Sequence, residues 1–358
     1  MRAERAVPAL TLLGLAALLG VGIWLLSGTP GSLVNEEPPP LGPTPGSPDD
    51  AVLVRVEAGD GASEIGDKLE AAGVIQSARH FRVLAALMGL GHDLVPGDYE
   101  FERGETALSA LRRISQGLTS SLVVTIPEGL RAAEVAQVLE RRGVVSAQDF
   151  LNALSVTYVA PFLEGEPGPG LEGFLFPATY SFSRGIAPQQ VAQQMLDAFD
   201  QRYREQIAPL LGDRSLREVV TLASIIEREA RVPEERPVIA SVFLNRLELG
   251  FPLAADPTVQ YALGSDPASV QQFGYWKREL TSADLQVASA YNTYVNVGLP
   301  PGPIANPGLD SILAALEPAG TGYLFFVARP DGSHAFAETI EEHVQNICEI
   351  NPARPECG

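Results

Sequence analysis

Residues 215–231 read SLREVVTLASIIEREAR, a pattern that predicts a buried helix at the centre of the fold. Ser215 and Glu218 have the S-x-x-E spacing of a capping box, so the helix is expected to begin there. Pro233 is expected to stop it at the other end, because the residue before a proline avoids helical geometry. The same helix carries the residue on which the functional prediction depends.

Glu229 falls inside the apolar arc of this helix. At roughly 100° per residue, the arc comprises Val219, Leu222, Ile225, Ile226 and Val232. Glu227 and Arg228 are predicted to face away, as solvated charges. A carboxylate among apolar neighbours loses hydration, which raises its pKa and supplies a general acid near neutral pH. The alternative is a structural glutamate held by an arginine such as Arg246 on the next helix.

A weak internal repeat precedes this helix. Residues 54–81 (VRVEAGDGASEIGDKLEAAGVIQSARHF) resemble residues 124–150 (VTIPEGLRAAEVAQVLERRGVVSAQDF). In both, a β-branched strand leads to a glycine and then to an amphipathic helix. Gly73 and Gly143 stand at the expected C-terminal cap of that helix. The sequence therefore predicts a strand–helix unit that is used twice.

The remaining pattern predicts an α+β fold. Residues 93–117 read as a turn, a strand and a helix at 107–115, and the chain past residue 160 reads as mostly helical. Near the end, a β-rich segment at 323–328 is followed by Arg-Pro-Asp-Gly and a returning strand at 334–336, the pattern of a hairpin. A last helix is expected at about residues 340–347.

The N-terminal region predicts a membrane anchor. No charged residue occurs between Ala6 and Val34, and about 20 apolar residues suffice to cross a bilayer. Arg2 and Arg5 precede the apolar run, so the N-terminus is expected in the cytoplasm and the rest outside. A cleaved signal peptide is the competing interpretation. The expected parts are a stub and anchor at 1–27 and a Pro-rich spacer at 28–50.

Composition excludes some classes of function. The 358 residues carry a formal net charge of −19, which argues against nucleic acid as a partner. The four histidines do not cluster with cysteines or carboxylates, so neither a metal site nor a cofactor is expected. Cys348 and Cys357 are the two cysteines, and outside the cytoplasm they are candidates for one disulfide.

Several segments resemble the MltG (YceG-like) family of endolytic murein transglycosylases. These are LEGFLFPATY (171–180), TLASIIEREA (221–230), ASVFLNRLELG (240–250), DPTVQYALG (256–264), YNTYVNVGLPPGPIANPGLDSILAALEPAGTGYLFFVA (291–328) and GSHAFAETIEEH (332–343). They cover most of residues 170–345 in family order. The first motif departs from the aromatic-rich family version, since it reads Phe174-Leu175-Phe176.

The resemblance implies a domain plan and an activity. A LysM-like subdomain is expected at 51–122, a catalytic domain at 123–350 and a tail at 351–358. The family's catalytic glutamate matches Glu229, the residue that helical geometry also selects. It implies an enzyme of the plasma membrane, single-pass, whose catalytic domain lies outside the cytoplasm. The implied partners are peptidoglycan glycan strands, the membrane and, as further candidates, wall-synthesis enzymes.

The implied reaction is lytic. Glu229 would protonate the oxygen between MurNAc and GlcNAc and then deprotonate the MurNAc C6 hydroxyl, which closes a 1,6-anhydro ring. One carboxyl suffices, because the substrate supplies the nucleophile. A lysozyme-like hydrolase would need a second carboxylate, for which Asp256 and Glu172 are candidates. A non-catalytic peptidoglycan-binding scaffold is the other alternative.

Further residues are candidates for substrate contacts. They are Glu172, Phe174, Asn245, Arg246, Asp256, Thr258, Tyr291, Asn292, Pro300, His334 and Phe336. Several have a structural alternative: Phe174 as a packed aromatic residue, Arg246 as an ion-pair partner of Glu229 or Glu172, and His334 as a core histidine. Asp256 is also a candidate N-cap with Pro257 in the first helical position.

Overall fold

The computed structural model describes residues 51–91, 94–164, 170–354 and 357. The predicted anchor and spacer, residues 1–50, lie outside these ranges. Among the helices of the described ranges, none is both long enough and apolar enough to cross a membrane.

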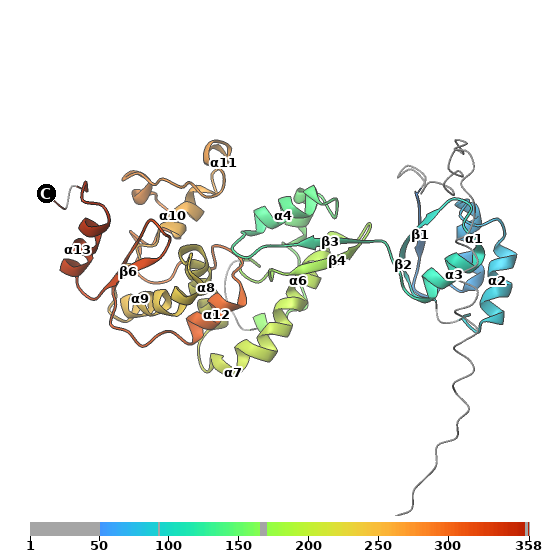
Figure 1. Ribbon diagram of the computed structural model, residues 1–358, viewed down its shortest axis with the longest axis horizontal. Helices are drawn as coiled ribbons and strands as arrows, with labels where there is room; N and C mark the ends of the chain where they lie inside the picture. The colour runs from blue at the N-terminus through green and yellow to red at the C-terminus, as the bar shows by residue number, and fades with distance from the viewer. Residues whose placement is uncertain (1–50, 92–93, 165–169, 355–356, 358) are drawn as a thin grey trace, which may run out of the picture. The chain divides into compact units, whose positions relative to one another are not determined.

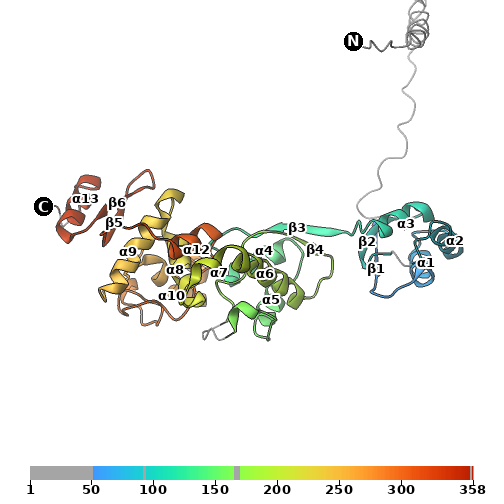
Figure 2. The same ribbon diagram turned by 90° about the horizontal axis from the view of Figure 1, so that it is seen from below.

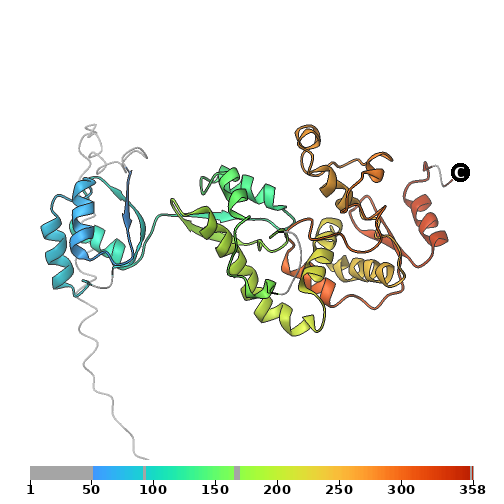
Figure 3. The same ribbon diagram turned by 180° about the vertical axis from the view of Figure 1, so that it is seen from behind.

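The first folded unit has the order strand–helix–helix–strand–helix. Its elements are β1 (Ala51–Val56), α1 (Ala62–Ala71), α2 (Ala78–Leu87), β2 (Gly97–Glu102) and α3 (Ala107–Ser115). The two strands pair antiparallel with Val54 opposite Tyr99, and α1 and α2 lie next to each other (Figure 3). The core contains Ile65, Leu69, Phe81, Tyr99, Phe101 and Leu111. The predicted strand and helix within residues 93–117 are confirmed.

The second folded unit repeats this order. Its elements are β3 (Ser121–Thr125), α4 (Ala132–Arg141), α5 (Ala147–Ala153), β4 (Thr179–Ser183) and α6 (Pro188–Arg202). Figure 2 shows β3 and β4 side by side, and they pair antiparallel with Val123 opposite Ser181. The prediction that the chain past residue 160 is mostly helical up to the hairpin is confirmed, but it did not include the strand β4.

The same local signals shape both units. Ser77 caps α2 and Ser146 caps α5, each accepting a hydrogen bond from a backbone N–H of the first turn. Gly73 and Gly143 follow α1 and α4 with φ angles of 71° and 70°, the left-handed conformation that glycine adopts without strain. The predicted repeat is confirmed, and it extends over five elements rather than two.

The rest of the chain is mainly helical. It comprises a π-helical turn (Tyr203–Ile207), α7 (Ala208–Leu211), α8 (Leu216–Glu229), α9 (Arg236–Glu248), α10 (Asp256–Leu263), α11 (Pro267–Phe273) and α12 (Leu309–Leu316). In the described ranges, 3-10 turns occur at Pro233–Glu235 and Asp284–Gln286, and another at Pro161–Leu163 lies between α5 and β4. Figure 1 shows α8 between α12 and α10, and both contact it.

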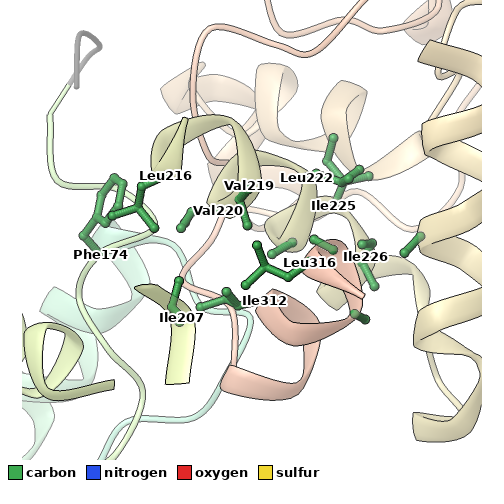
Figure 4. Close-up of a cluster of buried hydrophobic side chains, with 14 of the residues drawn as sticks. Phe174, Ile207, Leu216, Val219, Val220, Leu222, Ile225, Ile226, Ile312 and Leu316 are labelled. Carbon is green, nitrogen blue, oxygen red and sulfur yellow. The ribbon is translucent and has the colours of Figure 1, made fainter. Parts of the chain in front are cut away.

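Helix α8 is the centre of the largest hydrophobic core. It begins at the predicted position, where the Ser215 side chain accepts a hydrogen bond from the Glu218 N–H. Val219, Leu222, Ile225 and Ile226 of the predicted apolar arc are buried, and Figure 4 shows them near Ile312 and Leu316 of α12. Val232, the fifth residue of the arc, is half-buried and lies beyond the end of the helix. Residues 219–226 of α8 are all buried, so the helix is enclosed on nearly every side until its last turn.

The C-terminal part contains the predicted hairpin, formed by β5 (Phe325–Ala328) and β6 (His334–Ala337). The last helix, α13 (Ile340–Ile350), packs against this hairpin and is three residues longer than the sequence indicates. Cys348 and Cys357 form a disulfide with a Cα–Cα distance of 5.3 Å, the pairing considered from the sequence. This bridge ties the end of the chain to α13.

Candidate active site

Glu229 is the last residue of α8 and lines a cavity of about 240 Å³. Its side chain is half-buried, at the point where the enclosed helix reaches the surface. The other lining residues come from four segments: Arg246; Leu253, Ala254 and Asp256; Tyr294; and Phe326, Ala328 and His334. Segments distant in sequence thus converge on one cavity.

The surroundings of Glu229 favour its protonated form. Burial raises the pKa of its carboxyl to about 8, and the nearby charge of Asp256 adds to this rise. Arg246, Arg228 and Arg231 act in the opposite direction, but they are weaker than burial. Within the described part of the chain, no group hydrogen-bonds or ion-pairs with this carboxyl. Glu229 is therefore neither clamped by a guanidinium nor directed into bulk water.

Arg246 forms part of the cavity wall. Its Nε donates to the carbonyl of Leu324 at 2.6 Å, and Nη1 donates to the carbonyl of Leu253 at 2.6 Å. These bonds hold the guanidinium to the β5 segment and to the loop before α10. The expected ion pair with Glu229 or Glu172 is not among the salt bridges of the described residues. Arg246 instead supplies a fixed positive charge beside the carboxyl.

Asp256 is the second carboxylate of the cavity. It is the first residue of α10, whose N-cap is Ala255, so the predicted capping role of Asp256 is wrong. Its Oδ1 instead accepts a hydrogen bond of 2.7 Å from the Tyr294 hydroxyl. Ala254, two residues before Asp256, has a φ of 45°, a strained conformation for a non-glycine residue. This strained turn brings Asp256 to the cavity.

His334 of β6 also lines the cavity. Its Nδ1 is 2.6 Å from Oε2 of Glu235, and its backbone N–H donates to Oε1 of the same carboxylate at 3.0 Å. Only 5% of the residue is exposed, and its ring meets the edge of Phe326. Phe336 packs behind these rings, against Phe326 and Tyr323, and does not line the cavity.

Glu172 belongs to a separate network. Its carboxylate accepts hydrogen bonds from the Ala132 N–H at 2.7 Å and from Nδ2 of Asn306 at 3.1 Å. Burial raises its pKa to about 8. Asn306 also accepts bonds from the Gly173 and Leu175 N–H groups, both at 2.9 Å. This network joins the first turn of α4 to the loops that carry Glu172 and Asn306, and Glu172 does not line the cavity of Glu229.

Other residues expected at the site have structural contacts instead. Phe174 is fully buried against Phe162 and Phe199, so its ring is not available for stacking on a sugar. Asn245 donates from Nδ2 to the carbonyls of Thr321 and Tyr323, both at 2.9 Å.

The loop residues also satisfy their own surroundings. Thr258 is buried and shares a 2.8 Å hydrogen bond with Thr293. Asn292 donates to the carbonyls of Leu285 and Val287. Tyr291 packs against Tyr261, and Pro300 lines another hollow of the surface. None of these four lies among the lining residues of the Glu229 cavity.

Glu227 and Arg228 are not the solvated pair that the helical pattern predicts. The Glu227 side chain is 9% exposed and accepts a 2.7 Å bond from the Ser311 hydroxyl and a 3.2 Å bond from the Gly308 N–H. The guanidinium of Arg228 lies 3.9 Å from the ring centre of Trp276. The prediction of solvent exposure is wrong because α10, α12 and their loops cover this side of α8 as well.

Tyr294, Phe326 and Glu235 were missed by the sequence analysis. Tyr294 stands three residues after Tyr291 in the same motif, which is the one signal that could have identified it. Phe326 and Glu235 carry no local signal, since their roles arise from contacts across the chain. Among the described residues, no group of three or more His, Cys, Asp or Glu side chains is placed to hold a metal ion.

Comparisons with known proteins identify the family of this chain. The family model of the YceG-like family matches residues 54–349. An endolytic murein transglycosylase of Bacillus subtilis is 31% identical over 311 residues, which cover 82% of each chain. One from Streptococcus pneumoniae is 29% identical over 325 residues, and the match spans 58% of that longer protein. The crystal structure of a putative yceG-like protein from Listeria monocytogenes matches with a TM-score of 0.55 and 32% identity, over 83% of this chain and 99% of that one. The chain belongs to the YceG-like family.

Proposed function

We propose that this protein is an endolytic murein transglycosylase in which Glu229 acts first as an acid and then as a base. The observation that carries this proposal is the Glu229 carboxyl: its pKa is raised to about 8, it lines an open cavity, and no described group pairs with it. A carboxyl of this kind keeps its proton at neutral pH and can give it to a glycosidic oxygen. The names of the relatives supply the substrate class.

The reaction follows from one carboxyl. Glu229 donates its proton to the oxygen that links MurNAc C1 to GlcNAc, and the C1–O bond breaks as positive charge develops at C1. The resulting carboxylate then takes the proton of the MurNAc C6 hydroxyl, and the C6 oxygen bonds to C1. Proton and bonds balance without water, and the products carry a 1,6-anhydro end. Because the nucleophile is part of the bound sugar, its attack is intramolecular and therefore fast.

The other cavity residues have supporting roles. Asp256 raises the pKa of Glu229 by its charge, and Arg246 places a fixed positive charge in the same cavity. The ring of Phe326 gives the cavity an apolar surface suited to a sugar face.

Hydrolysis is the second candidate, since Asp256 lies in the same cavity and a hydrolase needs a second carboxylate. However, Oδ1 of Asp256 already accepts a hydrogen bond from Tyr294, which favours a role in positioning and charge.

The flanking regions support a setting at the cell surface. We propose that the apolar N-terminal run anchors the chain in the plasma membrane and that the folded part lies outside the cytoplasm. The disulfide between Cys348 and Cys357 supports an oxidising compartment. The order β1–α1–α2–β2 supports a LysM-like unit that binds glycan strands beside the catalytic part.

The decisive experiment compares wild type, Glu229→Gln and Glu234→Gln on purified sacculi. Glu234 is exposed and five residues away, so its substitution is a matched control. We expect Glu229→Gln to lower the cleavage rate about 10³-fold, the usual contribution of a general acid–base group, and Glu234→Gln to leave it unchanged. Mass spectrometry then distinguishes anhydro ends from reducing ends, which are heavier by one water. Reducing ends would support the hydrolase. Full activity of Glu229→Gln would refute the role of Glu229, and a lack of cleavage by purified wild type would support the scaffold.

A further inference from the structure

A larger hollow of about 890 Å³ lies beside the same last turn of α8. Glu229 lines the first cavity, whereas its neighbours Arg228, Ala230 and Arg231 line this one. The loop after α11 contributes Tyr275, Trp276 and Arg278. We call this hollow the arginine groove, and the mechanism above does not use it.

Two residues that line the groove, Arg228 and Trp276, are held in place by stacking and a hydrogen bond. Arg228 lies over Trp276 at 3.9 Å, and the Trp276 Nε1–H donates to Glu134 at 2.8 Å. Arg131 adds a second guanidinium, 5.1 Å from the ring centre of Tyr275. Such stacking holds the loop after α11 against α8 and α4. The groove is thus a preformed feature of the site.

Two arginines that line the groove, Arg231 and Arg278, are available to bind a ligand. Arg231 and Arg278 are exposed, and in the described ranges neither guanidinium donates a hydrogen bond to a protein group. The one carboxylate of the lining, Glu227, is engaged by Ser311 and Gly308. This positive patch is notable in a chain with a net charge of −19. Guanidinium groups of this kind bind carboxylates by charge-assisted hydrogen bonds.

We propose that the arginine groove binds the acidic peptide stem that MurNAc carries on its lactyl group. This inference rests on the proposed function, because the sugar that carries the stem is the sugar whose bond Glu229 would break. Arg231 is two residues from Glu229 in the chain, so their Cα atoms are at most about 8 Å apart. An extended stem of five residues spans about 16 Å, enough to reach from a sugar at Glu229 to the far side of the groove.

The exposed ring of Phe273 completes the fit. It also lines the groove, is 45% exposed, and provides an apolar surface beside the two arginines. A stem with carboxylates and short aliphatic side chains matches this combination, whereas a bare glycan strand has no group to place there. The groove therefore makes the enzyme selective for strands that still carry their peptides.

The first test measures kcat/KM on two substrates, glycan strands with acidic stems and strands stripped of stems. Arg278→Gln is the test variant, because Arg278 is not among the charges that act on Glu229. Arg142→Gln, at the exposed end of α4, removes the same charge outside the groove. We expect wild type and Arg142→Gln to favour stem-bearing strands about tenfold, the value of one charge-assisted hydrogen bond, and Arg278→Gln to lose most of this preference through KM. Equal wild-type kcat/KM on both substrates, or an unchanged preference in Arg278→Gln, overturns the proposal.

A binding test separates this inference from the catalytic one. Free stem peptide is titrated into wild type, Arg278→Gln and Arg142→Gln, alongside the same peptide with its carboxylates converted to amides. The acidic peptide should bind wild type and Arg142→Gln about tenfold more tightly than Arg278→Gln, and the amidated peptide should bind all three weakly. Equal binding of the acidic and amidated peptides refutes the groove assignment. If neither glycan is cut but the acidic peptide binds selectively, the proposed function fails and the groove assignment stands.

Discussion

Replacing Glu229 by glutamine should stabilise the protein, but only at neutral and alkaline pH. The folded state raises the pKa of this carboxyl from 4.5 to about 8, so it holds the proton more tightly than the unfolded chain does. As pH rises between these values, ionisation therefore favours unfolding, and stability is lost. Below pH 4.5 the group is protonated in both states and contributes no difference. Glutamine cannot ionise, so the variant avoids this loss.

The size of the effect follows from the shift. At about 1.4 kcal/mol per pH unit, a rise of this size would oppose folding by about 5 kcal/mol once pH exceeds 8. The side chain is half-buried at a cavity open to water, and this water reduces the cost to about 1–2 kcal/mol. For a folded part of this size, we expect a Tm increase of about 4 °C.

The assay is thermal unfolding at about pH 4.5, 6 and 8.5, with Glu234→Gln as control. At the lowest pH, Glu229→Gln should have the same Tm as wild type. As pH rises, its Tm should exceed that of wild type by an increasing amount. Glu234→Gln should follow wild type throughout. An equal gain at all three pH values, or a loss at pH 8.5, would refute the argument that Glu229 carries an unfavourable buried charge.

Three further results are expected. Asp256→Asn removes a like charge and should lower the pKa of Glu229, so the alkaline decline of kcat/KM moves down by about one pH unit; an unmoved decline contradicts the assigned coupling. Glu172→Ala leaves the Ala132 N–H without an acceptor and removes one of the two acceptors of Asn306 Nδ2, the other being the Leu130 carbonyl. We expect a loss of about 1–3 kcal/mol in denaturant unfolding, and a loss below about 0.5 kcal/mol would contradict the structural role of this network. Cys348→Ser opens a loop of sequence separation 9 and should weaken the packing of α13 by about 2.5 kcal/mol. Faster hydrogen exchange in α13 with unchanged cleavage is the expected pattern there, and lost cleavage would contradict it.

Local signals predicted the elements that local forces determine. The repeat was visible because Gly73 and Gly143 mark helix ends whatever the rest of the chain does. Glu229 was identified because the helical period places a charged residue on the apolar side of the helix at that position. Strand β4 was missed because it forms only when β3 pairs with it, and no turn signal joins the two.

The composition of the cavity needed the tertiary structure. Asp256 was assigned a cap because Asp-Pro is a common helix start, yet the strained turn at Ala254 directs it to Tyr294 instead. Glu227 was assigned to solvent because a helical pattern with one apolar arc leaves the other side exposed. Here a second layer, α12 and the loop before it, covers that side. A helical pattern thus identifies the apolar side of a helix, but it does not show which other elements cover the polar side.

The two glutamates at the end of α8 have different roles: Glu227 makes structural contacts, and Glu229 lines the cavity. Glu227 and Glu229 are two residues apart, so they point about 200° apart around the helix. Glu227 meets Ser311, the Gly308 N–H and, at 3.9 Å, Arg236, and it thereby ties α8 to α12. Glu229 meets none of these donors, and burial without a partner is what raises its pKa to about 8. The bonds of Glu227 hold the end of α8 in place, and this rigidity keeps Glu229 at the cavity without a hydrogen bond of its own.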